Sequence, residues 1–175
     1  IVSDAGSRGF AAGERPMADG EVRQRLAAVL AADVAGYSRL MGDDERATIA
    51  ALDAGRAVFG ERIAAHGGRV VDMAGDSVLA VFDSAAGALP EARRMRFRIG
   101  INSGDIHEKS DGSVYGDGVN IAARLEALAD PGGIMVSEFA FAQVRRNPDI
   151  VFRDSGQHRV KNIAEPVRAF GLVFE

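Results

Sequence analysis

The sequence predicts a mixed α/β domain in which short strands alternate with amphipathic helices. Residues 69–82 contain two short apolar runs, rich in β-branched side chains, around a Gly75-Asp76 corner, which is the pattern of a β-hairpin. Residues 96–102 alternate strictly between polar and apolar side chains, which indicates a half-buried strand. Between residues 49 and 63, apolar side chains instead recur at helical spacing.

Size and composition are those of one globular domain. The chain has 175 residues, enough to bury a core, and 47% of them are hydrophobic and 26% charged. Residues 1–22 are expected to form a tail or linker, because their first part shows no periodicity, and residues 23–175 to form the domain.

Charge and amino-acid usage argue against several classes of function. The formal net charge is -4, so broad electrostatic binding to nucleic acid or to an anionic membrane is not expected. The absence of cysteine excludes disulfides, thiolate zinc sites and cysteine nucleophiles. No apolar run approaches the roughly 18 residues of a membrane span, and the N-terminus lacks a signal pattern. A cytoplasmic domain without membrane contact is therefore expected.

The first half of the chain predicts a strand, a helix and the hairpin, in that order. Residues 26–32 are apolar on both faces, as in a central strand. A helix then begins with Asp43 or Asp44 as its cap and stops at the glycines 67–68. Its apolar positions are Ile49, Leu52, Phe59 and Ile63.

After the strand at 96–102, the second half predicts a turn, a helix and two strands. The turn is at residues 111–112, and the helix begins at Asp117 or Gly118 and ends before residues 130–133. Its apolar face is predicted to contain Ile121, Leu125 and Leu128. The remaining strands are expected at residues 134–136 and 167–173.

The connection before residue 96 is unusually short. A crossover that covers a sheet usually needs a dozen or more residues. Residues 84–95 also include Pro90, which interrupts any helix. We therefore expect that residues are missing between Ser84 and Met95.

Two acidic residues end apolar runs that are expected to be neighbouring strands. Asp33 follows residues 26–32, and Asp76 lies at the tip of the hairpin. Two carboxylates in this arrangement can share a hard divalent cation such as Mg²⁺, which takes oxygen ligands and leaves positions open for phosphate. The alternative is that Asp76 supplies turn chemistry and Asp33 caps nearby amides.

Four blocks of the sequence resemble, in order, the catalytic domain of class III nucleotidyl cyclases, the adenylyl and guanylyl cyclase family. They are DVAGYS at 33–38, GD at 75–76, FRIGINSG at 97–104 and GDGVNIAARL at 116–125. The resemblance covers about residues 25–173, but family members have a longer segment, with a helix, in place of residues 84–95. It implies a ferredoxin-like βαββαβ core with an antiparallel-rich sheet, and a head-to-tail homodimer with its active sites at the subunit interface.

Carried over by position, the resemblance implies that Asp33 and Asp76 bind two divalent metal ions, Mg²⁺ or Mn²⁺. In this chemistry one ion lowers the pKa of the ribose 3′-hydroxyl that attacks the α-phosphorus, and the other neutralises phosphate charge. Backbone amides of Ala35, Gly36 and Tyr37 can form a small nest for the phosphates.

Asn120 and Arg124 match the transition-state pair of the family, and a spacing of four places them on one face of a helix. Asparagine can orient the ribose, and arginine can stabilise charge that develops on the α-phosphate. Lys161 matches a family lysine that binds the terminal phosphates. The alternative is that Arg124 pairs with Glu126 or Asp130 on a solvated face.

Asp72 and Ser113 occupy the positions that select the base, where adenylyl cyclases of the family commonly have a lysine and an aspartate. A carboxylate accepts hydrogen bonds from the N1–H and N2–H₂ groups of guanine, but it repels the N1 acceptor of adenine. The pair therefore resembles that of guanylyl cyclases, unless Asp72 points away from the site. Most bacterial-looking members of the family use ATP, so ATP is the expected substrate and GTP the close alternative.

Two other classes of function fit the sequence less well. A cyclase-like module without activity is expected to lack a metal aspartate, Asn120 or Arg124, and all are present. An RNA-binding domain on a similar core needs exposed aromatic side chains and a basic face, whereas this chain is acidic and 6% aromatic. The histidines at 66, 107 and 158 are scattered and predict no zinc site.

Overall fold

The computed structural model of the protein describes residues 21–84, 96–160, 163 and 165–174. Its helices are α1 (Tyr37–Asp43), α2 (Glu45–Ala65), α3 (Asp117–Leu128) and α4 (Glu138–Val144). Its strands are β1 (Val22–Val34), β2 (Gly68–Asp72), β3 (Ser77–Phe82), β4 (Phe97–Lys109), β5 (Val114–Tyr115), β6 (Ile134–Ser137), β7 (Val151–His158) and β8 (Val167–Val173).

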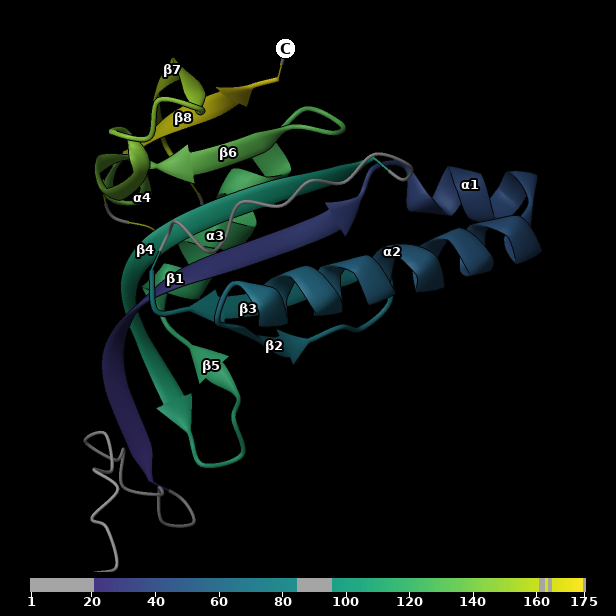
Figure 1. Ribbon diagram of the computed structural model, residues 1–175, viewed down its shortest axis with the longest axis horizontal. Coiled ribbons are helices and arrows are strands. Elements are labelled where there is room, and N and C mark those ends of the chain that lie inside the picture. Colours follow the sequence, from purple (N-terminus) through teal and green to yellow (C-terminus); the bar gives the residue numbers. More distant parts are fainter. Residues whose placement is uncertain (1–20, 85–95, 161–162, 164, 175) are drawn as a thin grey trace, which may run out of the picture.

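All the strands belong to one sheet with the order β2-β3-β1-β4-β6-β8-β7, and β5 pairs with β4 (Figure 1). The pair β4–β6 is parallel, whereas the other neighbouring pairs are antiparallel. The predicted mixed fold with an antiparallel-rich sheet is therefore confirmed.

Strand β1 is central because helices cover the sheet on both of its faces. The even-numbered side chains of β1, such as Leu30, share a core with Leu52 and Phe59 of α2 and with residues of α4. The odd-numbered side chains, such as Val29, pack on the other face with Ala122 of α3. The apolar run at 26–32 thus predicted a central strand correctly, although the observed strand is longer at both ends.

Helix α2 forms where its cap and glycine signals predict it. The Asp44 carboxylate accepts a hydrogen bond from the Ala47 amide at 3.0 Å and caps the first turn. Gly67, with φ 70°, follows the last turn in a conformation that favours glycine. Leu52, Phe59 and Ile63 are buried as expected, but Ile49 is exposed, so its place in the core was wrongly predicted.

The alternating pattern predicted that one face of β4 would be exposed, but both faces are largely buried. Helix α3 covers the second face, and the two backbones approach each other closely there. A Cβ atom added to Gly100 would lie 2.1 Å from the carbonyl oxygen of Ala122 and 2.2 Å from the amide nitrogen of Glu126. Asn102, also on this face, is buried and donates from Nδ2 to the Gly118 carbonyl at 3.1 Å. This face of β4 is therefore buried, because Gly100 has no side chain and the Asn102 side-chain amide is hydrogen-bonded.

Helix α3 begins at Asp117, one of the two predicted positions. Its buried side chains and glycine are Gly118, Ala122 and Leu125. Leu128 is exposed, so the predicted apolar face is wrong at its C-terminal end, where Ala129 is buried instead. Four short or polar elements had no sequence prediction, namely α1, α4, β5 and β7.

Most of the predicted N-terminal tail and the short connection at residues 85–95 lie outside the described residues. Within the ranges that the structure describes, no helix combines the length and the hydropathy needed to cross a membrane.

Candidate active site

The ends of β1 and β3 bring Asp33 and Asp76 together. Asp33 is the last but one residue of β1, where its Cα pairs with Ser77 of β3 and Arg98 of β4. Asp76 directly precedes Ser77, and the two carboxyl groups are within hydrogen-bonding reach of each other. The proximity that the sequence predicted is therefore present.

The pair of carboxylates is electrostatically strained. Burial raises the pKa of Asp33 above its ordinary value, and the negative charge of Asp76 raises it further. The backbone of Val34 and the charge of Arg98 act in the opposite direction but do not cancel these effects. Adjacent anions held in this way favour a cation between them.

The donor set fits a hard divalent cation, because every ligand atom is an oxygen. Among the described residues, no group of three or more histidine, cysteine or acidic side chains is arranged to hold a metal. Asp33 and Asp76 would then supply only part of a coordination shell, which leaves the other positions for water and phosphate oxygens.

Further charged residues lie close to this pair and were not predicted, namely Glu126, Arg98 and Arg56. Burial raises the pKa of Glu126 to about 7, the charges of Asp33 and Asp76 contribute, and Arg98 opposes the shift. A sequence signal existed for Glu126, because it lies four residues after the buried Ala122, on the side of α3 that contacts β4. The prediction treated it only as a surface partner of Arg124.

Arg56 of α2 holds the turn that carries Asp76. One nitrogen, Nη2, donates to the Met73 carbonyl at 2.9 Å and to the Gly75 carbonyl, while Nε is buried with no partner in the described chain. Its signal in the sequence is a charge on a buried stripe, because it lies between Leu52 and Phe59 at helical spacing. The prediction overlooked this signal.

The predicted phosphate nest is smaller than expected. The Ala35 amide donates to the Arg96 carbonyl at 2.9 Å, so it is not free to bind a phosphate. Gly36 has φ 73° and precedes the first turn of α1. Its amide and that of Tyr37 have no partner within the part of the chain that is described. Lys161 lies outside the described residues.

Asn120 and Arg124 lie apart from the aspartate pair. Both are exposed on α3, on the side away from β4, and neither contacts Asp33 or Asp76. The alternative surface role also lacks support, because no ion pair joins Arg124 to Glu126 or Asp130 among the described contacts. One subunit therefore presents the predicted groups as two separate sets.

The two predicted base-selecting residues both present acceptor oxygens. Asp72 ends β2, and its Oδ1 accepts from the Met73 amide at 2.8 Å. Ser113 lies in the β4–β5 turn, where its amide donates to the Asp111 carboxylate at 2.9 Å and its hydroxyl donates to the same group. These bonds lower the pKa of Asp111, so its carboxylate stays ionised and can only accept. The free lone pairs of the Ser113 hydroxyl are left as acceptors.

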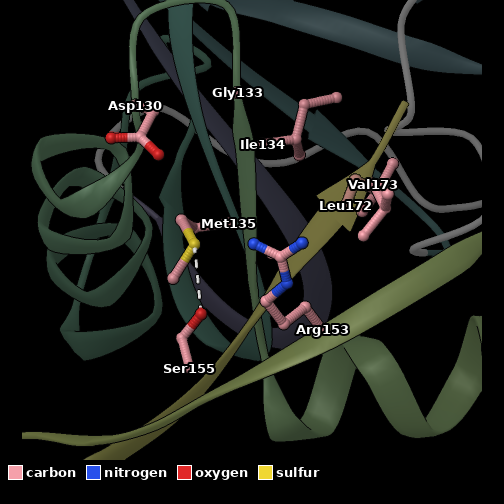
Figure 2. Close-up of a pocket in the computed structure, with 9 residues that line it drawn as sticks. Asp130, Gly133, Ile134, Met135, Arg153, Ser155, Leu172 and Val173 are labelled. Carbon is pink, nitrogen blue, oxygen red and sulfur yellow. Dashed lines mark hydrogen bonds between the residues drawn. The ribbon is translucent and has the colours of Figure 1, made fainter. Parts of the chain in front are cut away.

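Two pockets are lined by other residues. The first, about 390 Å³, lies at the start of α3 and includes Leu26 and Phe139, which are 64% and 75% exposed. The second, about 280 Å³, lies beside β6, β8 and β7 (Figure 2). Figure 2 shows Arg153 extending into it and Asp130 at its far side. No residue predicted for catalysis, metal binding or base selection lines either pocket.

Residues 56–172 of the chain match the family described as adenylate and guanylate cyclase catalytic domain. The putative adenylate cyclase 3 of Rhizobium meliloti (strain 1021) is 46% identical over 169 residues, covering 86% of this chain and 29% of that protein. An adenylate cyclase of Streptomyces coelicolor is 32% identical over 137 residues, covering 71% of this chain and 35% of that protein.

A solved structure supports the same assignment. The crystal structure of an adenylate/guanylate cyclase/hydrolase from Silicibacter pomeroyi has a TM-score of 0.79 and 38% identity to this chain, covering 89% of this chain and 100% of that one. The chain spans only about a third of the length of the curated relatives it matches, which is 29% for one and 35% for the other.

Proposed function

Because the chain belongs to the adenylate and guanylate cyclase catalytic domain family, we propose that it converts a purine nucleoside triphosphate, ATP in the first place, into the 3′,5′-cyclic monophosphate and pyrophosphate. The observation that carries this proposal is the pair Asp33 and Asp76, two carboxylates that the ends of β1 and β3 hold together despite their repulsion. Residues 23–175 form the catalytic domain in this proposal.

Asp33 and Asp76 hold two divalent cations, Mg²⁺ or Mn²⁺. When bound, such ions lower the pKa of the attacking ribose 3′-hydroxyl and offset the charge of the phosphates. Asp33 and Asp76 lose their mutual repulsion in that state, and this favours binding. The amides of Gly36 and Tyr37 bind phosphate oxygens, and Lys161 binds the terminal phosphates.

Asn120 and Arg124 complete the site of a second subunit in a head-to-tail homodimer. Their exposure on α3, apart from the aspartate pair of their own chain, supports this arrangement. Leu26 and Phe139 are exposed around the pocket at the start of α3, as expected of a surface that a second copy covers. In the shared site Asn120 orients the ribose, and Arg124 stabilises charge on the α-phosphate.

GTP is the second candidate substrate, and a specific observation favours it. Asp72 and Ser113 both present acceptors, which suit the N1–H and N2–H₂ donors of guanine. ATP is placed first because two relatives with 46% and 32% identity are named adenylate cyclases.

The direct test is incubation of the purified chain with ATP or GTP, each with Mg²⁺ or Mn²⁺, followed by separation of the products. A cyclic monophosphate and pyrophosphate in equal amounts are expected from at least one nucleotide. Failure to form either product under all four conditions contradicts the proposed activity.

Mixed dimers test the shared site. Asp33→Ala and Arg124→Ala should each be inactive alone, because each homodimer lacks the same half of both sites. With free exchange at equal concentrations, about half the dimers are mixed and each has one intact site, so roughly a quarter of the parent activity should return. Analytical ultracentrifugation first confirms that subunits exchange. If they exchange and the mixture remains inactive, the site is not shared.

A further inference from the structure

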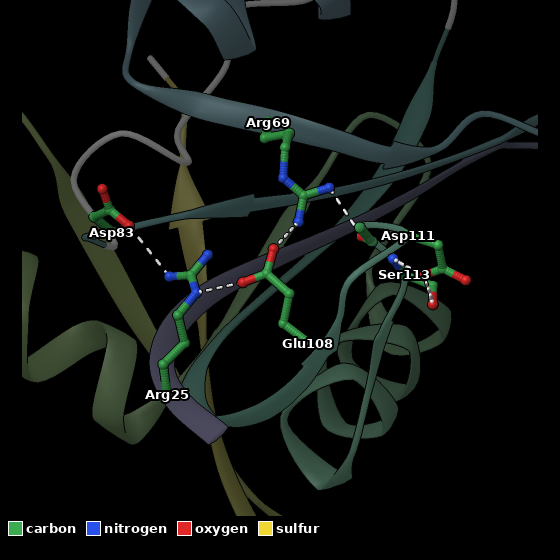
Figure 3. A network of polar contacts seen from close by, with 7 residues as sticks. Arg25, Arg69, Asp83, Glu108, Asp111 and Ser113 are labelled. Carbon is green, nitrogen blue, oxygen red and sulfur yellow. Dashed lines mark hydrogen bonds and ion pairs between the residues drawn. The ribbon is translucent and has the colours of Figure 1, made fainter. Parts of the chain in front are cut away.

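Glu108, near the end of β4, forms ion pairs with two arginines from different strands (Figure 3). Arg25 of β1 donates from Nε to Oε2 at 2.9 Å, and Arg69 of β2 pairs through Nη2 with Oε1. The Glu108 side chain is only 16% exposed. Arg25 also reaches the Asp83 carboxylate at 3.2 Å. We call Arg25, Arg69 and Glu108 the clamp.

The second arm of Arg69 reaches the turn between β4 and β5. Its Nη1 donates to the Gly112 carbonyl at 2.9 Å. Gly112 immediately precedes Ser113, and Arg69 is three residues before Asp72 on β2. The arginine therefore connects the strand that carries one proposed base-selecting residue to the turn that carries the other.

Arg69 ties this turn to β2 through a side-chain bond, and the strand that closes the turn is short. Strand β5 contains two residues and pairs only with β4 among the described strands. A two-stranded hairpin of this length is not stable by itself. The Ser110 amide bonds to the Glu21 carbonyl at 3.2 Å near the start of the turn. Two backbone bonds of Lys109 close the turn, one from the Gly112 amide at 2.9 Å and one to the Ser113 carbonyl at 3.0 Å, and Arg69 adds a bond from β2 at the tip.

We propose that Arg69 and Glu108 are positioning residues that fix the separation of Asp72 and Ser113, and thereby set the preference of the site for one purine over the other. The inference rests on the proposed cyclase function and deepens it. Recognition of a purine edge by two acceptors depends on their spacing, because a displaced acceptor no longer meets its donor within hydrogen-bonding distance. Arg69 controls that spacing from outside the base pocket.

The ion pairs of the clamp are expected to persist at neutral pH, because Glu108 stays ionised. Although burial opposes it, hydrogen bonding and charge from Arg25 and Arg69 hold the pKa of Glu108 below its ordinary value. The carboxylate is thus ionised throughout the neutral range and keeps both arginines. A guanidinium is planar and has several donors, so Arg69 can bind Glu108 and Gly112 at once, which a lysine cannot do with the same geometry.

The test replaces Arg69 by glutamine and compares purine selectivity. Arg168→Gln is the matched control, because Arg168 also pairs with acidic side chains, Asp154 at 2.6 Å and Glu138 at 3.7 Å, but on β8. Binding of 3′-deoxy-ATP and 3′-deoxy-GTP is titrated in the 175-residue chain, and kcat and KM are measured with ATP and GTP. The 3′-deoxy nucleotides bind without cyclising, so selectivity is read independently of turnover.

For Arg69→Gln we expect KM for the preferred purine to rise roughly 3- to 10-fold, the effect of losing one or two net hydrogen bonds. The ratio of the two nucleotide affinities should move toward one by a similar factor. The half-saturating Mn²⁺ concentration and the values for Arg168→Gln should remain within twofold of the parent. Arg69→Lys should recover part of the selectivity. If Arg69→Gln leaves the affinity ratio unchanged, the inference is overturned.

Hydrogen exchange separates positioning from general loss of structure. Amides of residues 110–115 should exchange faster in Arg69→Gln, while amides of β1 and β3 remain protected. If Arg69→Gln does not fold, Glu108→Gln, which keeps the side-chain shape, is measured in its place. Unchanged exchange at the turn contradicts the inference. The parent chain could bind both purines with the expected selectivity and yet form no cyclic product. That result contradicts the proposed function but not the role of the clamp in purine selectivity.

Discussion

The two ends of the β1–β4 ladder use the same residue types to opposite effect. At one end Asp33, paired in register with Arg98, lies beside Asp76, and its pKa is raised. At the other end Glu108 lies between two arginines, and its pKa is lowered. The first end thus places two negative charges side by side, whereas the second pairs a negative charge with positive ones.

This difference separates a site from its support. Opposite charges that meet at hydrogen-bonding distance stabilise the fold with no ligand present. Carboxylates that repel each other destabilise it, so their presence at the ends of two buried strands indicates a site that binds a cation or reacts. Neutral substitutions at the two ends should therefore change the free energy of unfolding in opposite directions.

Removal of either of the two aspartates proposed to bind metal should have the largest effect. Asp33→Ala or Asp76→Ala should lower cyclase turnover by about 10³-fold or more, because a ligand of the reacting centre is lost. In the presence of a chelator the thermal midpoint should not fall, since each change relieves repulsion. Product formation and circular dichroism melting measure the two effects, with the exposed Asp53→Ala as the control. Turnover close to that of the parent is incompatible with the metal assignment.

Glu108→Gln should destabilise the protein by about 2 kcal/mol at pH 7, because hydrogen bonds to charged partners are lost. The folded-state pKa of Glu108 is lowered, so its contribution is present above the unfolded pKa of about 4.3 and is lost as the pH falls through the folded value. Urea unfolding at pH 7 and in acid checks this. The parent and variant should converge in acid, and a difference that does not depend on pH excludes the electrostatic cause.

Asp33→Asn should act in the opposite direction. Without divalent metal, we expect a gain of about 1 kcal/mol at pH 7, since the ionised pair no longer repels. A raised folded-state pKa means that this penalty is absent below the unfolded pKa of about 3.9 and complete above the folded value. The measurement is thermal melting in a chelator at acidic and neutral pH. Addition of Mn²⁺ should stabilise the parent more than the variant; equal stabilisation argues against the ion site.

Glu126→Gln should give the smallest effect. The pKa of Glu126 is raised from 4.5 to about 7, so the cost of ionising it develops between these values and is constant above them. The variant should therefore gain up to about 1 kcal/mol over the parent between pH 4.5 and 8, after allowance for the solvent that screens a half-buried side chain. Chemical unfolding in chelator measures the gain; a constant difference across this range is inconsistent with the shift.

Local signals predicted much of the fold. A cap at Asp44 and glycines at 67–68 defined α2, and the Gly75-Asp76 corner defined the hairpin. Strand β7 had no such signal, because its side chains are mostly exposed and polar and, among the described strands, it pairs with β8 alone. Helix α4 has seven residues, too few for periodicity to identify it, although Ser137 caps it by accepting from the Ala140 amide.

The candidate site divides in the same way. Asp33 and Asp76 end recognisable strands, so their proximity follows from the strand order. Glu126 and Arg56 join the site through helix packing and through bonds to backbone carbonyls, which one sequence does not specify. The Ala35 amide was wrongly predicted to be free, because its partner, the Arg96 carbonyl, is far away in the sequence.

The close contact at Gly100 fixes the position of α3 on β4. Because the backbones of α3 and β4 meet there without an intervening side chain, the helix cannot slide or rotate on the strand without a steric clash. Asn120 and Arg124 of α3 are therefore expected to move together with the sheet as one rigid body. In the proposed shared site, a change in the angle between two such subunits would therefore move Asn120 and Arg124 of one relative to Asp33 and Asp76 of the other.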